Sequence, residues 1–282
     1  AIVEIPETDR FVELDLAGTF LVSGGTSRSN LYRFGPMGGD AGAPLAQLDL
    51  PIFNLAFDSE GRLWATTGGG PLVELDPISG EILRSFGDGL TIALAVEPGT
   101  DRIFVSSNNG VEIFDPATGR FTHYSRDQNL RVGSLAFDRF GDLWATTWPD
   151  RTQVVRFTDS RRAELMLKFD APIDTLAFGQ VGTDLEDLLF VSANAGQFED
   201  TGAAEAGSTL TAVDPATLRR TPVAEGGTRG DVVVTTSDGR ILISQSRQVD
   251  VIRPVVAPLV VAVNPPNEAA VALPLPFISV TF

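Results

Sequence analysis

The sequence predicts an all-β fold in which small four-stranded sheets are arranged in a ring, a β-propeller. Three observations lead to this prediction: an internal repeat of about forty residues, four short strand-like runs in each repeat, and tight-turn signals between the runs. A single four-stranded sheet cannot bury both of its faces alone, so the repeated sheets must pack against one another. Counting the repeats predicts six blades over residues 1–257.

The repeat is clearest in two segments that match almost residue by residue. Leu55-Ala-Phe-Asp58 and Gly61-Arg-Leu-Trp-Ala-Thr-Thr67 recur as Leu135-Ala-Phe-Asp138 and Gly141-Asp-Leu-Trp-Ala-Thr-Thr147. Weaker copies of the first motif begin at Leu94 and Leu176. The third residues of the four motifs are 39, 41 and 41 residues apart: Phe57, Val96, Phe137 and Phe178. This nearly constant spacing sets the length of one unit.

Each unit is expected to contain four strands, named A to D in chain order. Strand A is the Leu-Ala-Phe-Asp run and strand B is the Leu-Trp-Ala-Thr run, so Trp64 and Trp144 are equivalent and should pack between blades. Strand C is a run such as Val73-Glu-Leu-Asp76, and strand D a run such as Ile82–Phe86. The intervening Asp-Pro-x-Thr/Ser-Gly motif predicts a tight turn, because Pro presets φ, Asp caps the turn and Gly accepts positive φ.

The six units begin near residues 11, 52, 92, 132, 173 and 231. The first unit is divergent in sequence, and the last shows three clear strands that end at Ile252. The fourth strand of the last unit is either Val255-Val256 or the N-terminal run Ile2-Val-Glu-Ile5.

The composition excludes several classes of function. The formal net charge is −16, so nucleic acid and anionic membranes are poor partners. Cys is absent and His123 is the one histidine, which excludes disulfides, thiol catalysis and multi-histidine metal sites. No transmembrane segment is expected, because prolines and Glu268 interrupt the longest uncharged stretches. The chain begins at Ala1 and shows no signal peptide, so we expect a processed chain or a piece of a longer protein.

The repeat motifs resemble those of bacterial propellers grouped around streptogramin lyase, gluconolactonase, and the NHL and two-component-regulator propellers. The resemblance rests on Leu-Ala-Phe-Asp-x-x-Gly-x-Leu-Trp-Ala-Thr and on the run from Phe114 to Tyr124, and it covers about residues 10 to 255. It implies the fold rather than a function, because these are turn and packing residues.

Two enzyme activities follow from the resemblance as hypotheses. The lyases of this group are understood to use an active-site histidine, whereas His123 falls in a strand D at the outer rim, so we do not expect that activity. The lactonases hold a divalent cation such as calcium in the central channel, and Asn54 and Asp174, just before strand A, are the candidate ligands. A metal-dependent lactonase-like or lyase-like enzyme is therefore the alternative. The leading expectation is no catalytic residue and no cofactor.

A ligand is expected at the loops between strands B and C, which vary in length and sequence while the C–D turns are short. Loops on a rigid scaffold are where binding usually occurs. Trp148 lies outside the repeated motif, beside Asp150 and Arg151, and this combination of side chains suits a saccharide or a peptide. Asn30 and Asn108 fall in equivalent loops. These five residues are the predicted site for a protein or carbohydrate ligand.

Residues 258–282 differ from the repeats and resemble the opening strands of a bacterial Ig-like domain. They contain an apolar strand, the turn Asn264-Pro-Pro-Asn-Glu268, and alternating Ile278, Val280 and Phe282. Such a domain needs about 100 residues, so these strands cannot bury their apolar faces alone. We therefore expect residues 259–282 to pair with the rest of such a domain or with another subunit, in end-to-end or filament-like self-assembly.

The sequence as a whole predicts a six-bladed β-propeller of four-stranded blades over residues 1–257, followed by an Ig-like strand segment over 258–282. The expected function is that of a non-enzymatic binding or structural module. We expect the parent to be a larger bacterial protein that is secreted or held at the cell surface.

Overall fold

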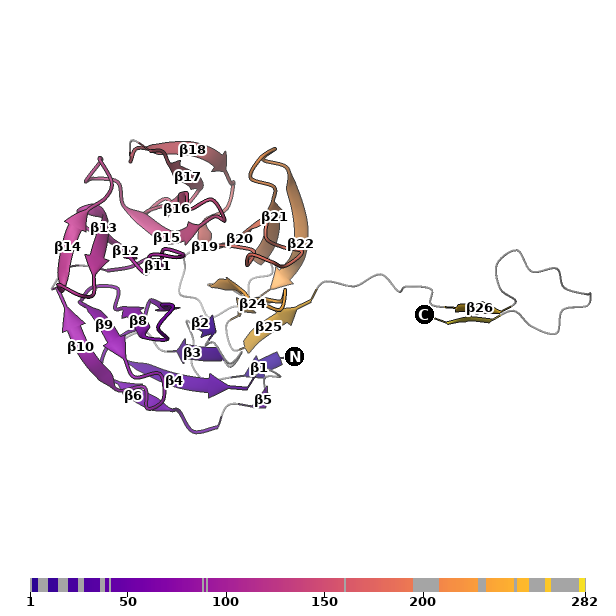
Figure 1. The fold of residues 1–282 in the computed structure, drawn as a ribbon, viewed down its shortest axis with the longest axis horizontal. Helices are drawn as coiled ribbons and strands as arrows, with labels where there is room; N and C mark the ends of the chain where they lie inside the picture. The colour runs from indigo at the N-terminus through magenta and orange to yellow at the C-terminus, as the bar shows by residue number, and fades with distance from the viewer. Residues whose placement is uncertain are drawn as a thin grey trace, which may run out of the picture. The chain divides into compact units, whose positions relative to one another are not determined.

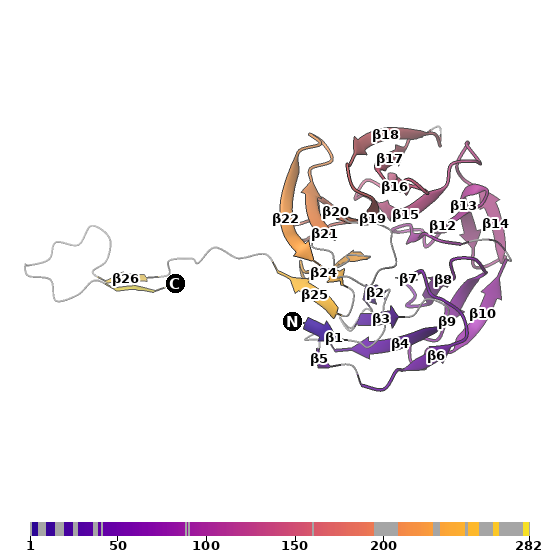
Figure 2. The same ribbon diagram turned by 180° about the vertical axis from the view of Figure 1, so that it is seen from behind.

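The computed structural model describes residues 2–4, 10–14, 20–24, 28–35, 39–40, 42–87, 89, 91–159, 161–194, 208–227, 232–245, 248–253, 262–264 and 279–281. Every regular element in these residues is a β-strand. The described residues contain no helix that is long and apolar enough to span a membrane. The chain divides into two compact units, residues 1–252 and residues 253–282. The first unit is a ring of small sheets (Figures 1 and 2).

Five sheets of the ring have four strands each and are named blades 1 to 5 in chain order. Blade 1 contains β2 (Arg10–Leu14), β3 (Phe20–Gly24), β4 (Ser29–Phe34) and β6 (Ala46–Leu48). Blade 2 contains β7 (Asn54–Phe57), β8 (Leu63–Thr66), β9 (Leu72–Leu75) and β10 (Ile82–Phe86). Blade 3 contains β11 (Leu94–Val96), β12 (Ile103–Ser107), β13 (Gly110–Asp115) and β14 (Arg120–His123).

The next two blades repeat this antiparallel order. Blade 4 contains β15 (Val132–Phe137), β16 (Leu143–Thr147), β17 (Gln153–Phe157) and β18 (Ala163–Lys168). Blade 5 contains β19 (Ile173–Phe178), β20 (Leu189–Asn194), β21 (Ser208–Val213) and β22 (Arg220–Gly227). In each blade the first strand lies toward the centre of the ring and the last strand at its rim (Figure 1).

The remaining sheet of the ring, here the closing sheet, joins the two ends of the first unit. Its strands are, in order, β23 (Val233–Thr235), β24 (Ile241–Ser244), β25 (Gln248–Ile252), β1 (Ile2–Glu4) and β5 (Gly39–Asp40). Strand β1 runs antiparallel to β25, with Val3 opposite Val249, and β5 runs parallel to β1. The N-terminal run, one of the two predicted alternatives, therefore extends the last repeat, while Val255-Val256 lies outside the described residues.

The ring is closed because its innermost strands contact one another in the order β2, β7, β11, β15, β19, β23 and back to β2. A propeller of four-stranded blades is therefore confirmed, but the predicted count of six such blades is wrong. In the described residues five blades have four strands and the closing sheet has five. The extra strand is β5, which comes from the connection between β4 and β6 of blade 1.

In blades 2 and 4, the buried carboxylate that ends the Leu-Ala-Phe-Asp motif explains why this motif occurs together with the Trp of the Leu-Trp-Ala-Thr motif. Asp58 accepts hydrogen bonds from Trp64 Nε1 at 2.9 Å and from the backbone amide of Arg62 at 2.9 Å, which ties the A–B turn to strand B. Asp138 receives the same two bonds from Trp144 Nε1 and the Asp142 amide. Both indoles are fully buried and pack on the next blade, as predicted.

The predicted Asp-Pro turns form at the end of strand C. In blade 3, Asp115 accepts hydrogen bonds from the Thr118 hydroxyl at 2.8 Å and from the Ala117 amide at 2.9 Å. The hydroxyl and then the amide bonds hold the pKa of Asp115 below its ordinary value. Gly119 closes the turn with φ of +67°, a conformation that glycine adopts without strain.

Hydroxyl groups link neighbouring sheets near the centre of the ring. Thr66 Oγ1 donates to the Ile92 carbonyl at 2.7 Å, from blade 2 to blade 3. Ser134 Oγ accepts from the Leu176 amide at 3.2 Å, and Thr175 Oγ1 accepts from the Val233 amide at 2.9 Å. These bonds satisfy backbone groups that the innermost strands cannot pair within their own sheets.

The second unit contains two described strands, β26 (Ala262–Asn264) and β27 (Ser279–Thr281), which pair antiparallel with Val263 opposite Val280. Ile278, Phe282 and the predicted domain boundary at 257 lie outside the described residues. A two-stranded pair does not identify an Ig-like domain, so that resemblance stays a prediction.

Removing residues 1–5 should destabilise the ring, because β25 then loses the backbone hydrogen bonds of the closing sheet. At about 0.5–1.5 kcal/mol per hydrogen bond, we expect the free energy of unfolding to fall by about 2–4 kcal/mol. Urea denaturation measures this loss, and a chain lacking residues 259–282 is the control, since we expect it to keep its stability. Equal stability of both truncated chains would show that β1 does not hold the ring closed.

Candidate functional site

The predicted ligand site lies on the face of the ring where strands B end and strands C begin, here the B–C face. Three of its five residues are brought together in the loop between β16 and β17: Trp148, Asp150 and Arg151. The Arg151 guanidinium carbon lies 5.3 Å from the centre of the Trp148 ring, and Thr147 Oγ1 donates to Asp150 Oδ1 at 2.6 Å. The loop therefore holds a half-buried indole in contact with a buried guanidinium.

Two local features place this pair. A Cβ added to Gly133 in β15 would lie 3.2 Å from Trp148 Cε3, so the glycine leaves room for the indole. The Trp148 amide donates to the Arg131 carbonyl at 2.9 Å. Arg151 adopts φ of +51°, a conformation that is uncommon outside glycine and that tertiary contacts must maintain.

The contact that maintains it is an ion pair with Asp174 in the first strand of blade 5. Arg151 Nη1 lies 2.7 Å from Asp174 Oδ1, and the two side chains are 9% and 4% exposed. The Arg151 carbonyl also accepts from the Ile173 amide at 2.6 Å. The loop of blade 4 is thus fixed to blade 5 by a buried charge pair and by the backbone.

The ion pair continues into a hydrogen-bonded relay through blade 5. Asp174 Oδ2 accepts from the Asn194 side-chain amide at the end of β20. Asn194 Oδ1 in turn accepts from Ser208 Oγ at 2.9 Å at the start of β21. The relay Arg151–Asp174–Asn194–Ser208 therefore joins one loop to three strands of the next blade.

The sequence reasoning missed Asn194 and Ser208, although a signal was present. Counting five residues from the first residue of strand B leads from Ile103 to Asn108, from Leu143 to Trp148 and from Leu189 to Asn194. These three residues hold the same place on the B–C face in blades 3, 4 and 5. Asn108 is exposed in the turn after β12, and Asn30 lies in β4 opposite Gly24 and Gln47.

The two candidate metal ligands come from different blades, and Asp174 is already paired with Arg151. Asn54 belongs to blade 2 and Asp174 to blade 5, which are not neighbours in the ring. They are not equivalent either, because Asn54 directly precedes Leu55 while Asp174 precedes Leu176 by two residues, at a bulge. Asn54 Oδ1 accepts from its neighbour's amide at 2.8 Å. No group of three or more possible ligands from His, Cys, Asp and Glu occurs in the described part of the chain.

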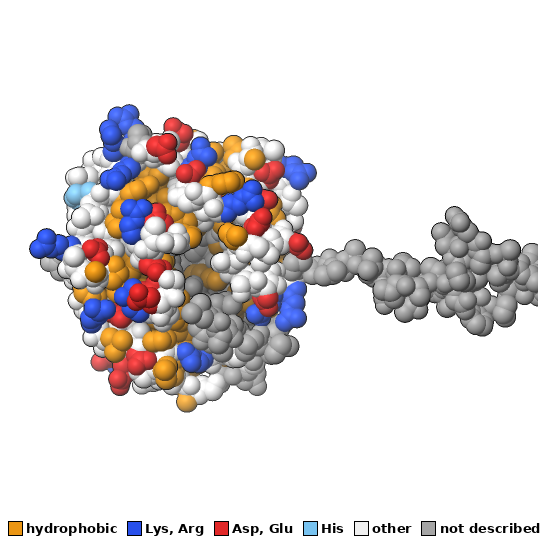
Figure 3. Space-filling view, viewed as in Figure 1, with side chains coloured by type: hydrophobic (Ala, Val, Ile, Leu, Met, Phe, Trp, Pro, Cys, Tyr) orange, Lys and Arg blue, Asp and Glu red, His pale blue; other side chains and the backbone are white. Residues whose placement is uncertain are grey.

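His123 lies where the sequence placed it, in β14 at the rim of blade 3. Its side chain is 48% exposed, and Nδ1 lies 3.7 Å from Glu112 Oε1. In the register of blade 3 it lies opposite Glu112, three residues after Asn109 of the B–C turn. Figure 3 shows acidic, basic and apolar side chains interspersed on one face of the ring, so the acidic surplus does not gather in a single patch there.

Comparison with solved structures identifies the fold. Virginiamycin B lyase from Staphylococcus aureus superposes with a TM-score of 0.59 at 11% identity, over 91% of this chain and 89% of that one. The chain shares the β-propeller fold. Hydrazine synthase from Kuenenia stuttgartiensis matches with a TM-score of 0.52 at 13% identity, over 70% of this chain and 56% of that one. No protein-family description and no curated protein matches the sequence.

The buried ion pair gives a test of the relay. Replacing Arg151 by Ala leaves Asp174 charged and buried, so we expect the free energy of unfolding to fall by about 3–5 kcal/mol. The double variant Arg151→Ala/Asp174→Ala should lose clearly less than the sum of the two single variants. Asp150→Ala is the matched control from the same loop, with an expected loss below about 1 kcal/mol. Additive losses in urea denaturation would contradict the coupling.

Proposed function

We propose that this chain is a non-enzymatic binding module that recognises a carbohydrate or a protein segment on its B–C face. The observation that carries the proposal is the contact between Trp148 and Arg151. Gly133 leaves room for the indole, and Asp174 forms an ion pair with the guanidinium. An indole offers a large apolar surface with little conformational freedom to lose. The Arg151 guanidinium, 9% exposed and paired with Asp174, fixes the position of this indole. Such a fixed pair favours binding because little ordering is left for the ligand to impose.

The polar residues around the pair would set specificity. Asp150 and Asn108 lie in B–C turns and offer acceptors and donors to hydroxyl or peptide groups. Asn30 at the edge of blade 1 belongs to the same proposed surface. We propose no resident cofactor and no catalytic residue in this module.

The enzymatic alternative has weaker support. Virginiamycin B lyase is an enzyme by name, but a likeness at 11% identity supports the fold alone. Both carboxylate oxygens of Asp174 accept hydrogen bonds, from Arg151 and from Asn194, which leaves that group poorly suited to ligate a cation. Metal analysis of the purified chain together with a lactone-hydrolysis assay addresses this alternative directly. Stoichiometric metal with turnover would favour it.

Binding should depend on Trp148. We expect the purified chain to bind members of a glycan array or a peptide array, and Trp148→Ala to lower the affinity for the strongest of them by about tenfold or more, since aromatic anchors dominate such sites. Isothermal titration measures the loss. Phe140→Ala is the control, because Phe140 is 78% exposed in an A–B turn on the other face of the ring. Loss of binding in Phe140→Ala, or unchanged affinity in Trp148→Ala, would place the ligand elsewhere.

We further propose that the module belongs to a larger secreted or cell-surface protein and self-assembles through its C-terminal strands. Among the described residues β26 and β27 form a sheet of two strands. A two-stranded sheet by itself is marginally stable in water, and a strand edge can accept a further strand. We expect light scattering to show concentration-dependent oligomers for residues 1–282 and a monomer for the chain lacking residues 259–282. A monomer in both cases would contradict self-assembly.

A further inference from the structure

One position in strand D fills the space between neighbouring sheets. In blade 2 this position is Phe86, which pairs with Leu72 at the start of strand C. The Phe86 ring centre lies 4.7 Å from that of Phe114 in blade 3 and 6.1 Å from that of Trp64. The aromatic ring thus reaches from the rim strand into the interface between blades 2 and 3.

The next two blades fill the same position with other large side chains. In blade 3 the residue opposite Val111 is Tyr124, whose ring centre lies 4.9 Å from that of Phe104 and 5.5 Å from that of Phe157 in blade 4. In blade 4 the residue opposite Val154 is Leu167, which is 6% exposed and packs in the core shared with blade 5. A large side chain at this position therefore seals each of these interfaces.

Blade 5 breaks this pattern. The residue opposite Leu210 at the start of its strand C is Ala224, and Glu225, Gly226 and Gly227 follow it. No residue of β22 belongs to the apolar core between blade 5 and the closing sheet. The methyl group of Ala224 cannot fill the volume that a phenyl ring fills in blade 2, so the interface stays open toward the rim.

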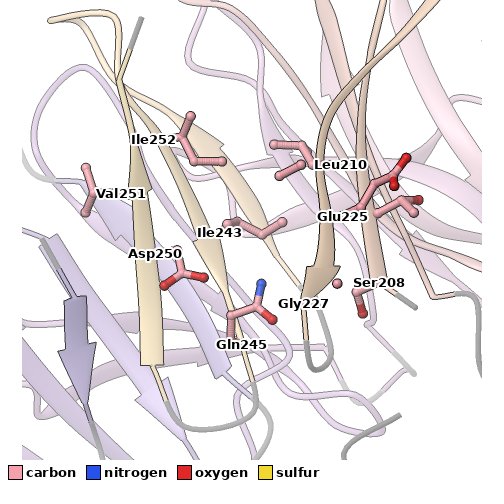
Figure 4. Close-up of a pocket in the computed structure, with 12 residues that line it drawn as sticks. Ser208, Leu210, Glu225, Gly227, Ile243, Gln245, Asp250, Val251 and Ile252 are labelled. Carbon is pink, nitrogen blue, oxygen red and sulfur yellow. The ribbon is translucent and has the colours of Figure 1, made fainter. Parts of the chain in front are cut away.

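The result is a cleft of about 420 Å³ between blade 5 and the closing sheet. Figure 4 shows Leu210, Ile243 and Ile252 directed into the space between β22 and β25. At one end the Gln245 side chain crosses to Gly227, where an added Cβ would lie 2.7 Å from its Oε1. The volume lies in the range of small-molecule sites, about 300–1,000 Å³.

The charge of the cleft is one-sided. Asp250 lies on the β25 wall opposite Ile243, whereas the Glu225 side chain points away from the cleft on the other side of β22 (Figure 4). None of the described residues that line the cleft is Lys or Arg. Asp250 Oδ1 accepts from Gln248 Nε2 at 2.7 Å, but a neutral amide does not compensate its charge. Among the described residues neither carboxylate forms an ion pair. A ligand that fits this wall composition is apolar in its body and positively charged at one end.

We propose that the cleft binds a small organic ammonium ion whose aromatic or aliphatic group occupies the space that Phe86 fills in blade 2. The apolar group would lie against Leu210, Ile243 and Ile252, and the ammonium group beside Asp250. Burial of the apolar group and the opposite charges both favour such a ligand over a neutral or anionic one. The site is distinct from the Trp148 surface, although Ser208 takes part in both the relay and the cleft wall.

The test uses 2-phenylethylammonium as the probe and the complete chain of residues 1–282. Isothermal titration should detect saturable binding to the wild type. The neutral analogue 2-phenylethanol should bind with an affinity at least about tenfold lower. Ala224→Phe should abolish binding without lowering the melting temperature, because the new ring fills the cleft as Phe86 does in blade 2. Val223→Phe is the matched control: it adds the same ring to the neighbouring residue of β22, which is exposed and does not line the cleft.

Further variants separate charge from shape and this site from the B–C face. Asp250→Asn should weaken binding of the ammonium probe and leave binding of the neutral analogue unchanged. Glu225→Gln is the matched control, because its side chain points away from the cleft and its loss should change neither affinity. Trp148→Ala should retain the affinity for the probe. Absence of saturable binding in the wild type, retained binding in Ala224→Phe, or equal affinity for the charged and neutral probes would overturn the proposal. Binding of a Phe-Lys dipeptide amide without binding of the free ammonium ion would also overturn it, by assigning the cleft to a peptide.

Discussion

The physical constraint on which this structure depends is that a four-stranded sheet has two apolar faces and no other element to cover them. Each face must therefore be covered by the next sheet, and the interfaces between sheets carry the core of the molecule. Trp64 and Trp144 illustrate how this is achieved without leaving polar atoms unpaired. Each indole is buried against the following blade, while its Nε1 donates to an aspartate that also holds the A–B turn. One carboxylate thus satisfies the ring nitrogen and fixes the loop.

The same constraint makes every departure from the repeat informative. Where strand D supplies Phe86, Tyr124 or Leu167, the interface is sealed. Where it supplies Ala224, with glycines at 226 and 227, the interface opens, and Asp250 gives the opening a negative charge. In blade 4, Gly133 leaves room for the indole of Trp148. In blade 2 the large residue and the glycine exchange places: Phe53 corresponds to Gly133, Gly68 corresponds to Trp148, and a Cβ on Gly68 would collide with the ring of Phe53. Positions that depart from the repeat are therefore the first places to look for function, because packing of the blades alone would favour the same kind of residue in every unit.

The B–C face shows how neighbouring blades cooperate. The Arg151–Asp174 pair is buried, and a buried pair contributes to stability only when its remaining hydrogen-bonding capacity is satisfied. The relay through Asn194 and Ser208 meets part of that requirement, and it does so with residues from three strands of a single blade. The position of the Trp148 loop is consequently decided by blade 5, although the loop belongs to blade 4. The loop is thus held by two neighbouring blades of a closed ring.

The sequence by itself determined the repeat, the strand order within a unit, the Asp-Pro turns and the burial of Trp64 and Trp144, because these depend on local periodicity, turn chemistry and side-chain size. It also identified the loop of Trp148, Asp150 and Arg151 as unusual. Only the tertiary structure decided that β1 and β5 complete the closing sheet, that Arg151 pairs with Asp174, and that Asn194 and Ser208 continue this pair into blade 5. These features join residues far apart in the chain. Their geometry is set by ring closure and by a bulge in β19, neither of which leaves a periodic signal in the sequence.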